Sequence, residues 1–245
     1  MPHEALARSF QTTGADYDLY RPGFPQAAVE AILPHPVDTV LELGAGTGKF
    51  TENLLEVAGQ VIAVEPSEQM LQVLRSKFPD VEALVGTAES VPLVDDTVQA
   101  VTVAQAFHWF DRAAACAEIA RVLVPGGTLG LVWNHSDPSC EWDRACHRIA
   151  HPAARATDDT TATSDSELPG FRLALHKEVQ WTERITREHY ICRWATVSSF
   201  LIADDQTRAT MLSEIEAVLD THLETAEKAE LALPQVTDVY VYSAR

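Results

Sequence analysis

The sequence predicts an α/β protein built on a parallel, doubly wound β-sheet. Short apolar runs alternate with segments of helical periodicity across residues 38–134. One of these runs, 98–107, is apolar on both faces, as is typical of a central parallel strand covered by helices on both sides. Eight of the 11 glycines lie between Gly44 and Gly130, where short loops join these segments.

The first elements form a β-α-β unit followed by a second helix. Strands are expected at 38–43 and 60–65, and a helix from about 49–57 joins them. Ser67 is a plausible N-cap for the next helix, whose apolar residues repeat at helical spacing until Pro79. A crossover of this kind places the two strands side by side and parallel.

The same alternation continues through the fifth strand. The third and fourth strands are expected at 81–85 and 98–107. Asp111 is placed to cap the following helix, and a Pro-Gly-Gly turn at 125–127 leads into a strand at 128–134. Strands and helices therefore alternate without a gap to Asn134.

The pattern is less regular on either side of this region. Residues 1–37 form an N-terminal helical lead-in, which ends at the Pro34-His35-Pro36 breaker. After Asn134 we expect a helix at 140–150 and then a loop at 153–170, which is either a lid or a plain surface loop. Beyond the loop we expect a strand at 176–185, helices from about 187 to 230, and a closing strand at 236–244.

We interpret the chain as one domain with four regions. They are an N-terminal helical cap (1–37), a core that binds the cofactor (38–135), a variable lid or acceptor region (136–200), and C-terminal helices with a closing strand (201–245). Nothing in the sequence predicts the oligomeric state.

Composition and charge exclude several classes of function. The chain is 46% hydrophobic and 22% charged, within the globular range. Its net charge of −18 disfavours nucleic acids and anionic membranes as partners. No run approaches the roughly 18 apolar residues of a membrane span, and the first residues lack a signal-peptide pattern. We therefore expect a cytoplasmic protein. The four cysteines form no CxxC pair, and in such a reducing compartment we expect free thiols.

A glycine-rich loop follows the first strand. Gly44, Gly46 and Gly48 stand where an open α/β sheet binds nucleotide-like ligands, and glycine lets backbone N–H groups approach such a ligand closely. Glu65 ends the second strand, 21 residues after Gly44. A carboxylate at that distance can accept hydrogen bonds from both ribose hydroxyls. The two features together predict a site for an adenosine-containing cofactor.

The glycine spacing separates two kinds of enzyme. Dinucleotide dehydrogenases carry G-x-G-x-x-G, whereas this chain has G-x-G-x-G preceded by Glu42. The third glycine stands one residue earlier than in the dehydrogenase pattern. An NAD-dependent oxidoreductase is kept as an alternative, and so is a non-catalytic module that binds a nucleoside.

Five motifs together resemble a known family. They are ELGAGTG, VEPSEQML, GTAESVPLVDDTVQAV, AQAFHWFD and EIARVLVPGGTLGLVWN, and the resemblance covers residues 14–135. The chain resembles class I S-adenosylmethionine-dependent methyltransferases, in the small-molecule branch of trans-aconitate methyltransferase-like (type 11) enzymes. The resemblance implies a seven-stranded Rossmann-like sheet with its last strand antiparallel. It also implies methyl transfer from S-adenosylmethionine, leaving S-adenosylhomocysteine, to a small carboxylate or hydroxylated metabolite.

The resemblance also assigns cofactor contacts. For the methionine part of the cofactor it implies contacts from Glu42, Gly44, Ala45, Gly46 and Gly48, with Gln105 and Ala106 below that part and Tyr20 with Arg21 folded over it. For the ribose it implies Glu65. For the adenine it implies Pro66, Ser67 and Met70 on one side and Thr87, Ala88 and Glu89 on the other. Many members carry an aspartate where this chain has Thr87. We therefore expect a backbone contact from Ala88 there.

The acceptor is expected at the carboxyl ends of the fourth and fifth strands. The residues assigned to it are Tyr17, Tyr20, Phe107, His108, Trp109, Trp133 and Asn134. His108 is the candidate general base, with acceptor orientation and a structural role as alternatives. His147 and His151 are four residues apart on a predicted helix, but no Glu completes a zinc motif, so we expect no metal.

Overall fold

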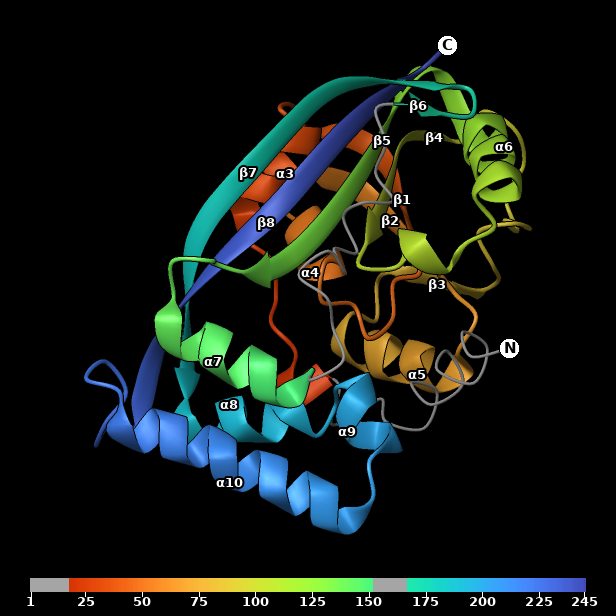
Figure 1. Cartoon of the computed structure of the whole chain (residues 1–245). Helices are drawn as coiled ribbons and strands as arrows, with labels where there is room; N and C mark the ends of the chain where they lie inside the picture. Colours follow the sequence, from red (N-terminus) through yellow and green to blue (C-terminus); the bar gives the residue numbers. More distant parts are fainter. Residues whose placement is uncertain (1–17, 152–166) are drawn as a thin grey trace. The chain divides into compact units, whose positions relative to one another are not determined.

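The computed structural model describes residues 18–151 and 167–245 (Figure 1). The chain divides into two compact units. The core unit comprises 23–134, 167–179 and 237–245, and the helical unit comprises 18–22, 135–151 and 180–236. Of the predicted loop at 153–170, only the last four residues lie within the described part of the chain. The single-domain interpretation stays a prediction.

The sheet has the order β3-β2-β1-β4-β5-β8-β7-β6. Its strands are β1 (Val37–Leu43), β2 (Ala58–Glu65), β3 (Glu82–Val85), β4 (Val98–Ala104), β5 (Leu123–Ser136), β6 (Glu167–Leu168), β7 (Phe171–Thr186) and β8 (Glu230–Ala244). Strands β1 to β5 pair in parallel. The chain reverses its order between β1 and β4, and such a switch point opens a crevice for a ligand.

The closing strand β8 runs antiparallel to its neighbours, as predicted. In the core unit, Thr237 donates a hydrogen bond to Asn134 at 2.6 Å. Also in that unit, the Arg245 N–H donates to Gly170 just before β7. The end of β8 therefore lies beside the start of β7, and Figure 1 shows β8 between β5 and β7. The α/β Rossmann-like prediction of seven strands is confirmed, and the two-residue β6 adds an eighth.

Helices cover both faces of the sheet in the core unit. These are α3 (Gln26–Ile32), α4 (Thr51–Leu54), α5 (Glu68–Lys77), the 3-10 turn η1 (Phe107–Trp109) and α6 (Arg112–Val122). Val40 and Ala100 face a buried cluster with α3, α4 and α5, whereas Leu41 and Val101 face the cluster that contains α6. Successive residues of a strand point to opposite faces, so neighbouring apolar positions in β1 and β4 fill two separate cores.

The predicted caps are present. Ser67 Oγ accepts the Met70 N–H at 3.4 Å at the start of α5. Asp111 accepts the N–H groups of Ala113 and Ala114, each at 3.0 Å, at the start of α6. Both side chains satisfy backbone donors that a helix leaves free in its first turn.

Two predicted elements differ in the structure. The helix expected at about 49–57 is only the four-residue α4, because Phe50 supplies no capping oxygen and β2 begins at Ala58. The Pro-Gly-Gly turn at 125–127 lies within β5, where the pairing with β4 shifts register between Val98 and Ala100. Neither the short helix α4 nor the start of β5 is marked in the sequence by a residue that caps a helix, as Ser67 and Asp111 mark α5 and α6.

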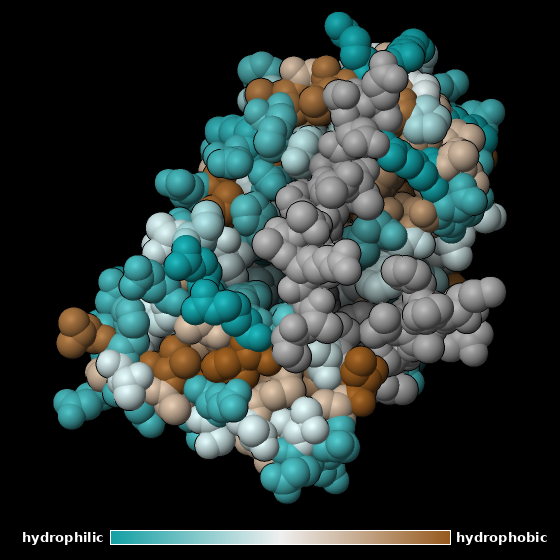
Figure 2. All heavy atoms as spheres, viewed as in Figure 1, coloured by the Kyte–Doolittle hydropathy of each residue, from teal (hydrophilic) through white to brown (hydrophobic). Residues whose placement is uncertain are grey.

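The helical unit has its own core. Its helices are α7 (Glu141–Ala150), α8 (Arg187–Trp194), α9 (Ser198–Ile202) and α10 (Asp205–Thr221). Trp142, Tyr190, Phe200, Ile215 and Leu219 are buried among them. Figure 2 shows hydrophobic and hydrophilic side chains interspersed over the visible surface. All four cysteines are free thiols, as predicted. In the described ranges, no helix is long and apolar enough to cross a membrane.

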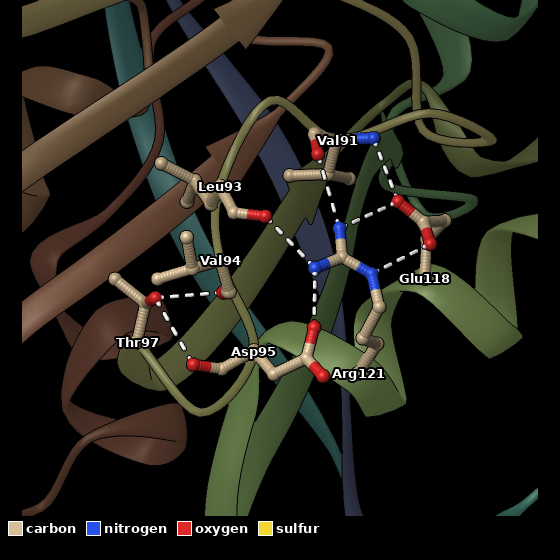
Figure 3. Close-up of polar contacts among 7 residues, drawn as sticks. All are labelled: Val91, Leu93, Val94, Asp95, Thr97, Glu118 and Arg121. Carbon is tan, nitrogen blue, oxygen red and sulfur yellow. Dashed lines mark hydrogen bonds and ion pairs between the residues drawn. The ribbon is translucent and has the colours of Figure 1, made fainter.

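Arg121 fixes the segment that follows β3 onto α6 (Figure 3). Its guanidinium donates to the carbonyls of Val91 and Leu93 at 3.0 and 2.8 Å. It also pairs with Glu118 at 2.8 Å and with Asp95 at 2.9 Å. These carboxylates raise the pKa of Arg121, which therefore stays charged. Arg121 of α6 thus holds the segment after Thr87–Glu89 through three of its residues, Val91, Leu93 and Asp95.

Candidate active site

The loop between β1 and α4 needs glycine for two reasons. Gly44, Gly46 and Gly48 have φ of +67°, +56° and +84°, a region that other residues rarely adopt. A Cβ on Gly44 would lie 2.6 Å from the Cβ of Ala106 after β4. On Gly46 it would meet only Met70 Sδ at 3.8 Å, so only the backbone conformation requires glycine there. The loop therefore packs against the end of β4 through Gly44.

Glu65 at the end of β2 is oriented by the same loop. Its Oε2 accepts the Gly46 N–H at 3.1 Å, and its Oε1 accepts the Ser67 N–H at 2.9 Å. The residue is only 7% exposed, and burial raises its pKa, while the two hydrogen bonds oppose that shift. Each carboxylate oxygen keeps a further acceptor position, as a vicinal diol requires. These residues fit the ribose of an adenosine cofactor.

Glu42 is buried on the strand that leads into the loop. Its carboxyl group is 1% exposed and accepts a hydrogen bond from Thr51 Oγ1 at 2.5 Å. Burial raises the pKa of Glu42 to about 8. The side chain therefore links β1 to α4 on either side of the loop.

The predicted adenine walls come from α5 and from the segment after β3. Ser67 and Met70 are buried, whereas Pro66 and Thr87 are exposed. Ala88 is 4% exposed. Glu89 Oε1 accepts the N–H of Asp111 at 2.9 Å, which attaches this segment to the start of α6. Sequence reasoning missed this contact because the two residues are far apart in the chain.

Gln105, just after β4, and Asn134, near the end of β5, are joined by a hydrogen bond. Gln105, with φ of +55°, donates through Nε2 to the carbonyl of Asn134 at 2.9 Å. The Asn134 side chain donates to the Gly23 carbonyl at 2.8 Å and accepts from Thr237. Both side chains thus hold strand ends together within the core unit.

The predicted aromatic rim separates into two parts. Trp109 is 39% exposed, and its ring lies 4.7 Å from the His108 ring between centroids. Phe107 and Trp133 are instead 3% and 1% exposed in the core, and Trp133 packs edge-on against Tyr240. Trp133 lies on the strand face that α6 covers. The assignment of Phe107 and Trp133 to the acceptor stays a prediction.

Tyr20 and Arg21 belong to the helical unit. The Tyr20 carbonyl accepts from Arg193 Nε at 2.8 Å, and Arg21 donates to the Thr196 carbonyl at 2.9 Å. Tyr17, the other N-terminal candidate, lies outside the described residues. Across 18–151 and 167–245, no group of three or more His, Cys, Asp or Glu side chains could hold a metal ion.

Comparison with known proteins identifies the family of the chain. The family described as "Methyltransferase domain" matches residues 41–131. An uncharacterized methyltransferase of Mycobacterium tuberculosis is 40% identical over 232 residues, which cover 95% of this chain and 94% of that protein. Another, from Schizosaccharomyces pombe, is 40% identical over 72% of each chain.

The fold comparison gives the same result. A solved methyltransferase from Anaeromyxobacter dehalogenans, whose assignment as type II is provisional, superposes with a TM-score of 0.72. It is 25% identical and covers 92% of this chain and 98% of its own. The fold and the glycine loop define a methyltransferase. The chain belongs to the class I S-adenosylmethionine-dependent methyltransferases, and this family and fold imply S-adenosylmethionine as the methyl donor.

Proposed function

We propose that the protein methylates a small molecule, either a carboxylate or a hydroxylated metabolite, and that the core unit binds the cofactor. The observation that carries this proposal is the Glu65 carboxylate, oriented by Gly46 and Ser67. The proposed cofactor contacts in the core unit are Glu42, Gly44, Ala45, Gly46, Gly48, Glu65, Pro66, Ser67, Met70, Thr87, Ala88, Glu89, Gln105 and Ala106.

The residues present fit the polar groups of this cofactor. Glu65 would accept hydrogen bonds from the ribose diol, and the loop would present backbone to the methionine part at Gly44. When bound, the cofactor supplies an electrophilic methyl group on a positively charged sulfur. The protein's contribution is to position the acceptor in line with that group.

We assign acceptor orientation to His108 and Trp109. Both belong to η1, directly after β4, and Trp109 is 39% exposed. A carboxylate acceptor reacts without a base, whereas a hydroxyl acceptor must lose a proton, and an imidazole can take it near neutral pH.

Charge and one relative support the acceptor class. A net charge of −18 disfavours a polyanionic acceptor such as nucleic acid. A malonyl-[acyl-carrier protein] O-methyltransferase of Methylococcus capsulatus is 38% identical over 111 residues. We propose that the chain belongs to the trans-aconitate methyltransferase-like branch, because the motifs that follow the glycine loop resemble that branch.

Calorimetric titration with S-adenosylhomocysteine, NAD and NADP tests the cofactor proposal. Saturable binding of S-adenosylhomocysteine alone supports it and justifies an acceptor screen. Binding of a nicotinamide nucleotide alone contradicts it. No binding of any of the three would instead favour a module without catalysis.

His108→Ala tests the acceptor role in the same assays. We expect unchanged affinity for S-adenosylhomocysteine and reduced turnover of any acceptor found in the screen. An equal loss of cofactor affinity and turnover would show that His108 supports the fold or the cofactor site.

A further inference from the structure

Gln105 has an unusual backbone conformation beside the proposed site. Its φ is +55°, in the left-handed region that residues other than glycine and asparagine rarely adopt. Among the described residues, the other two non-glycine positions with positive φ, Asp96 and Glu227, lie in exposed turns, whereas Gln105 is half-buried directly after β4. Strain of this kind persists only where the surrounding structure enforces it, and it concentrates at functional sites.

Two hydrogen bonds to β5 enforce this conformation. The Gln105 N–H donates to the Val132 carbonyl at 3.0 Å, and the side-chain Nε2 donates to the Asn134 carbonyl at 2.9 Å. Ala104, one residue earlier, is still paired with Val132 in the sheet. The chain therefore leaves the sheet at Gln105, while the Gln105 side chain stays attached to β5.

The Asn134 residue that accepts this bond is itself fixed, because its side chain is bonded at both ends. Asn134 Nδ2 donates to the Gly23 carbonyl at 2.8 Å, and Thr237 Oγ1 of β8 donates to Asn134 Oδ1 at 2.6 Å. The Gly23 carbonyl can only accept, so the amide nitrogen must face it and the amide oxygen must face the Thr237 hydroxyl. Thr237 is 0% exposed, so water does not compete for its bond.

The residues directly after Gln105 pack against the glycine loop. A Cβ on Gly44 would lie 2.6 Å from Ala106 Cβ and 3.5 Å from Phe110 Cζ, so both side chains lie against the backbone at Gly44. The Ala106 carbonyl accepts the Trp109 N–H at 2.9 Å, which starts η1. The conformation of Gln105 therefore sets the position of Ala106 at the cofactor loop and the position of η1, to which we assign the acceptor.

We propose that Gln105 is a positioning residue for methyl transfer. Its left-handed backbone, held on β5 by two hydrogen bonds, places Ala106 against the loop at Gly44 and fixes the start of η1. Asn134, which the sequence assigns to the acceptor, acts here through Gln105. This role rests on the proposed function and adds to the cofactor contact already proposed for Gln105. All of these residues belong to the core unit.

Gln105→Asn and Gln105→Met separate this role from a purely structural one. Asparagine adopts a left-handed backbone more readily than glutamine, but its side chain is one methylene shorter and loses the bond to Asn134. Methionine keeps the length and the backbone cost of glutamine and loses only the donor. We therefore expect urea unfolding to give Gln105→Asn a midpoint close to that of the parent and Gln105→Met a lower one.

The affinity for S-adenosylhomocysteine should fall in both variants by about five- to tenfold in calorimetric titration. One lost hydrogen bond lowers the share of molecules with Ala106 in place by about this factor, and the apparent affinity falls with that share. In the free protein, the amide NMR signal of Gly44 should move in both variants. Asp96→Asn places the same residue at an exposed position with φ of +51° and should change neither quantity.

Thr237→Val and Thr237→Ser test the step through Asn134. Valine has the shape of threonine without the hydroxyl, so the Asn134 amide loses the contact that orients it, whereas serine keeps that contact. We expect Thr237→Val to weaken S-adenosylhomocysteine binding and Thr237→Ser to bind more tightly than Thr237→Val. Equal affinities of the two variants would overturn this step.

Three results would overturn the role of Gln105. They are affinity of Gln105→Asn equal to that of the parent, a loss of affinity confined to the variant with the lower urea midpoint, and an unmoved Gly44 signal in both variants. Each would mean that Gln105 serves only the stability of the fold. If the parent itself binds no S-adenosylhomocysteine, the proposed function fails and the role of Gln105 fails with it. Normal binding by the parent and by both Gln105 variants counts against the role of Gln105 alone.

Discussion

The Glu42 carboxyl group accepts a 2.5 Å hydrogen bond from the Thr51 hydroxyl, and neither residue is more than 1% exposed. Glu42 is the last but one residue of β1 and Thr51 is the first residue of α4. The bond therefore ties together the two elements that flank the glycine loop. Because burial raises the pKa of Glu42 to about 8, this link rests on an acid that is protonated at neutral pH.

Glu42 should make the folded state less stable as the pH rises. Its pKa rises from 4.5 to about 8 on folding, so the folded chain binds the extra proton between these values. Its stabilising contribution is full below pH 4.5 and is lost as the pH approaches 8. The free energy of unfolding should fall by about 1.4 kcal/mol per pH unit in this window. Urea unfolding of Glu42→Gln and the parent at pH 5, 6, 7 and 8 measures the difference.

Glu52→Gln is the matched control for that experiment. Glu52 is exposed one position after Thr51, so its substitution should leave the pH slope of the parent intact. Identical slopes for Glu42→Gln and the parent would mean that Glu42 is ionised in the folded state.

Glu65→Ala should weaken binding of S-adenosylhomocysteine. The substitution removes an acceptor that two backbone N–H groups orient, and hydrogen bonds to a charged group contribute about 1.5–3 kcal/mol. Calorimetry should therefore show a loss of affinity of about 10- to 150-fold. Glu68→Gln, three residues further at an exposed site, should bind normally. Unchanged affinity in Glu65→Ala would remove Glu65 from the cofactor site.

Gly44→Ala should lower the free energy of unfolding by more than the cost of placing an alanine in a left-handed backbone conformation. The new Cβ would adopt a φ of +67° and meet Ala106 at 2.6 Å. Gly126 has a φ of +81° with nothing within 4 Å, so Gly126→Ala measures the backbone cost by itself, about 1–2 kcal/mol. Overpacking at Gly44 adds about 1–3 kcal/mol, which urea unfolding would detect. Equal losses in the two variants would show that the loop moves away from Ala106.

Local signals explain which parts of the fold the sequence predicts. Ser67 and Asp111 mark helix starts because their side chains bond to donors two or three residues away. By contrast, the burial of Trp133 depends on α6 and Tyr240, neither of which is adjacent in sequence. An aromatic residue at the end of a strand can line an acceptor site or lie in the core, and only the packing around it shows which of the two it does.

The contacts within the helical unit had no signal that sequence reasoning could have used. His147 and His151 suggest a metal pair by spacing, but no Glu completes a zinc motif there. The contacts of this unit join positions far apart, such as Tyr190 with Asp143 and Arg193 with Tyr20. Such pairs become visible only when α7 and α8 pack together.

Glu183→Gln should strongly destabilise the helical unit, whereas Glu230→Gln should not. The Glu183 and Arg193 side chains are 14% and 11% exposed, and Glu183 also accepts from Gln235 at 3.2 Å. Loss of one partner leaves a buried charge, which costs about 3–5 kcal/mol. The adjacent Arg184 pairs with Glu230 at 77% and 59% exposure, where about 1 kcal/mol or less is expected. Urea unfolding of both variants checks the contrast, and equal, small losses would mean that water reaches Arg193 in the folded protein.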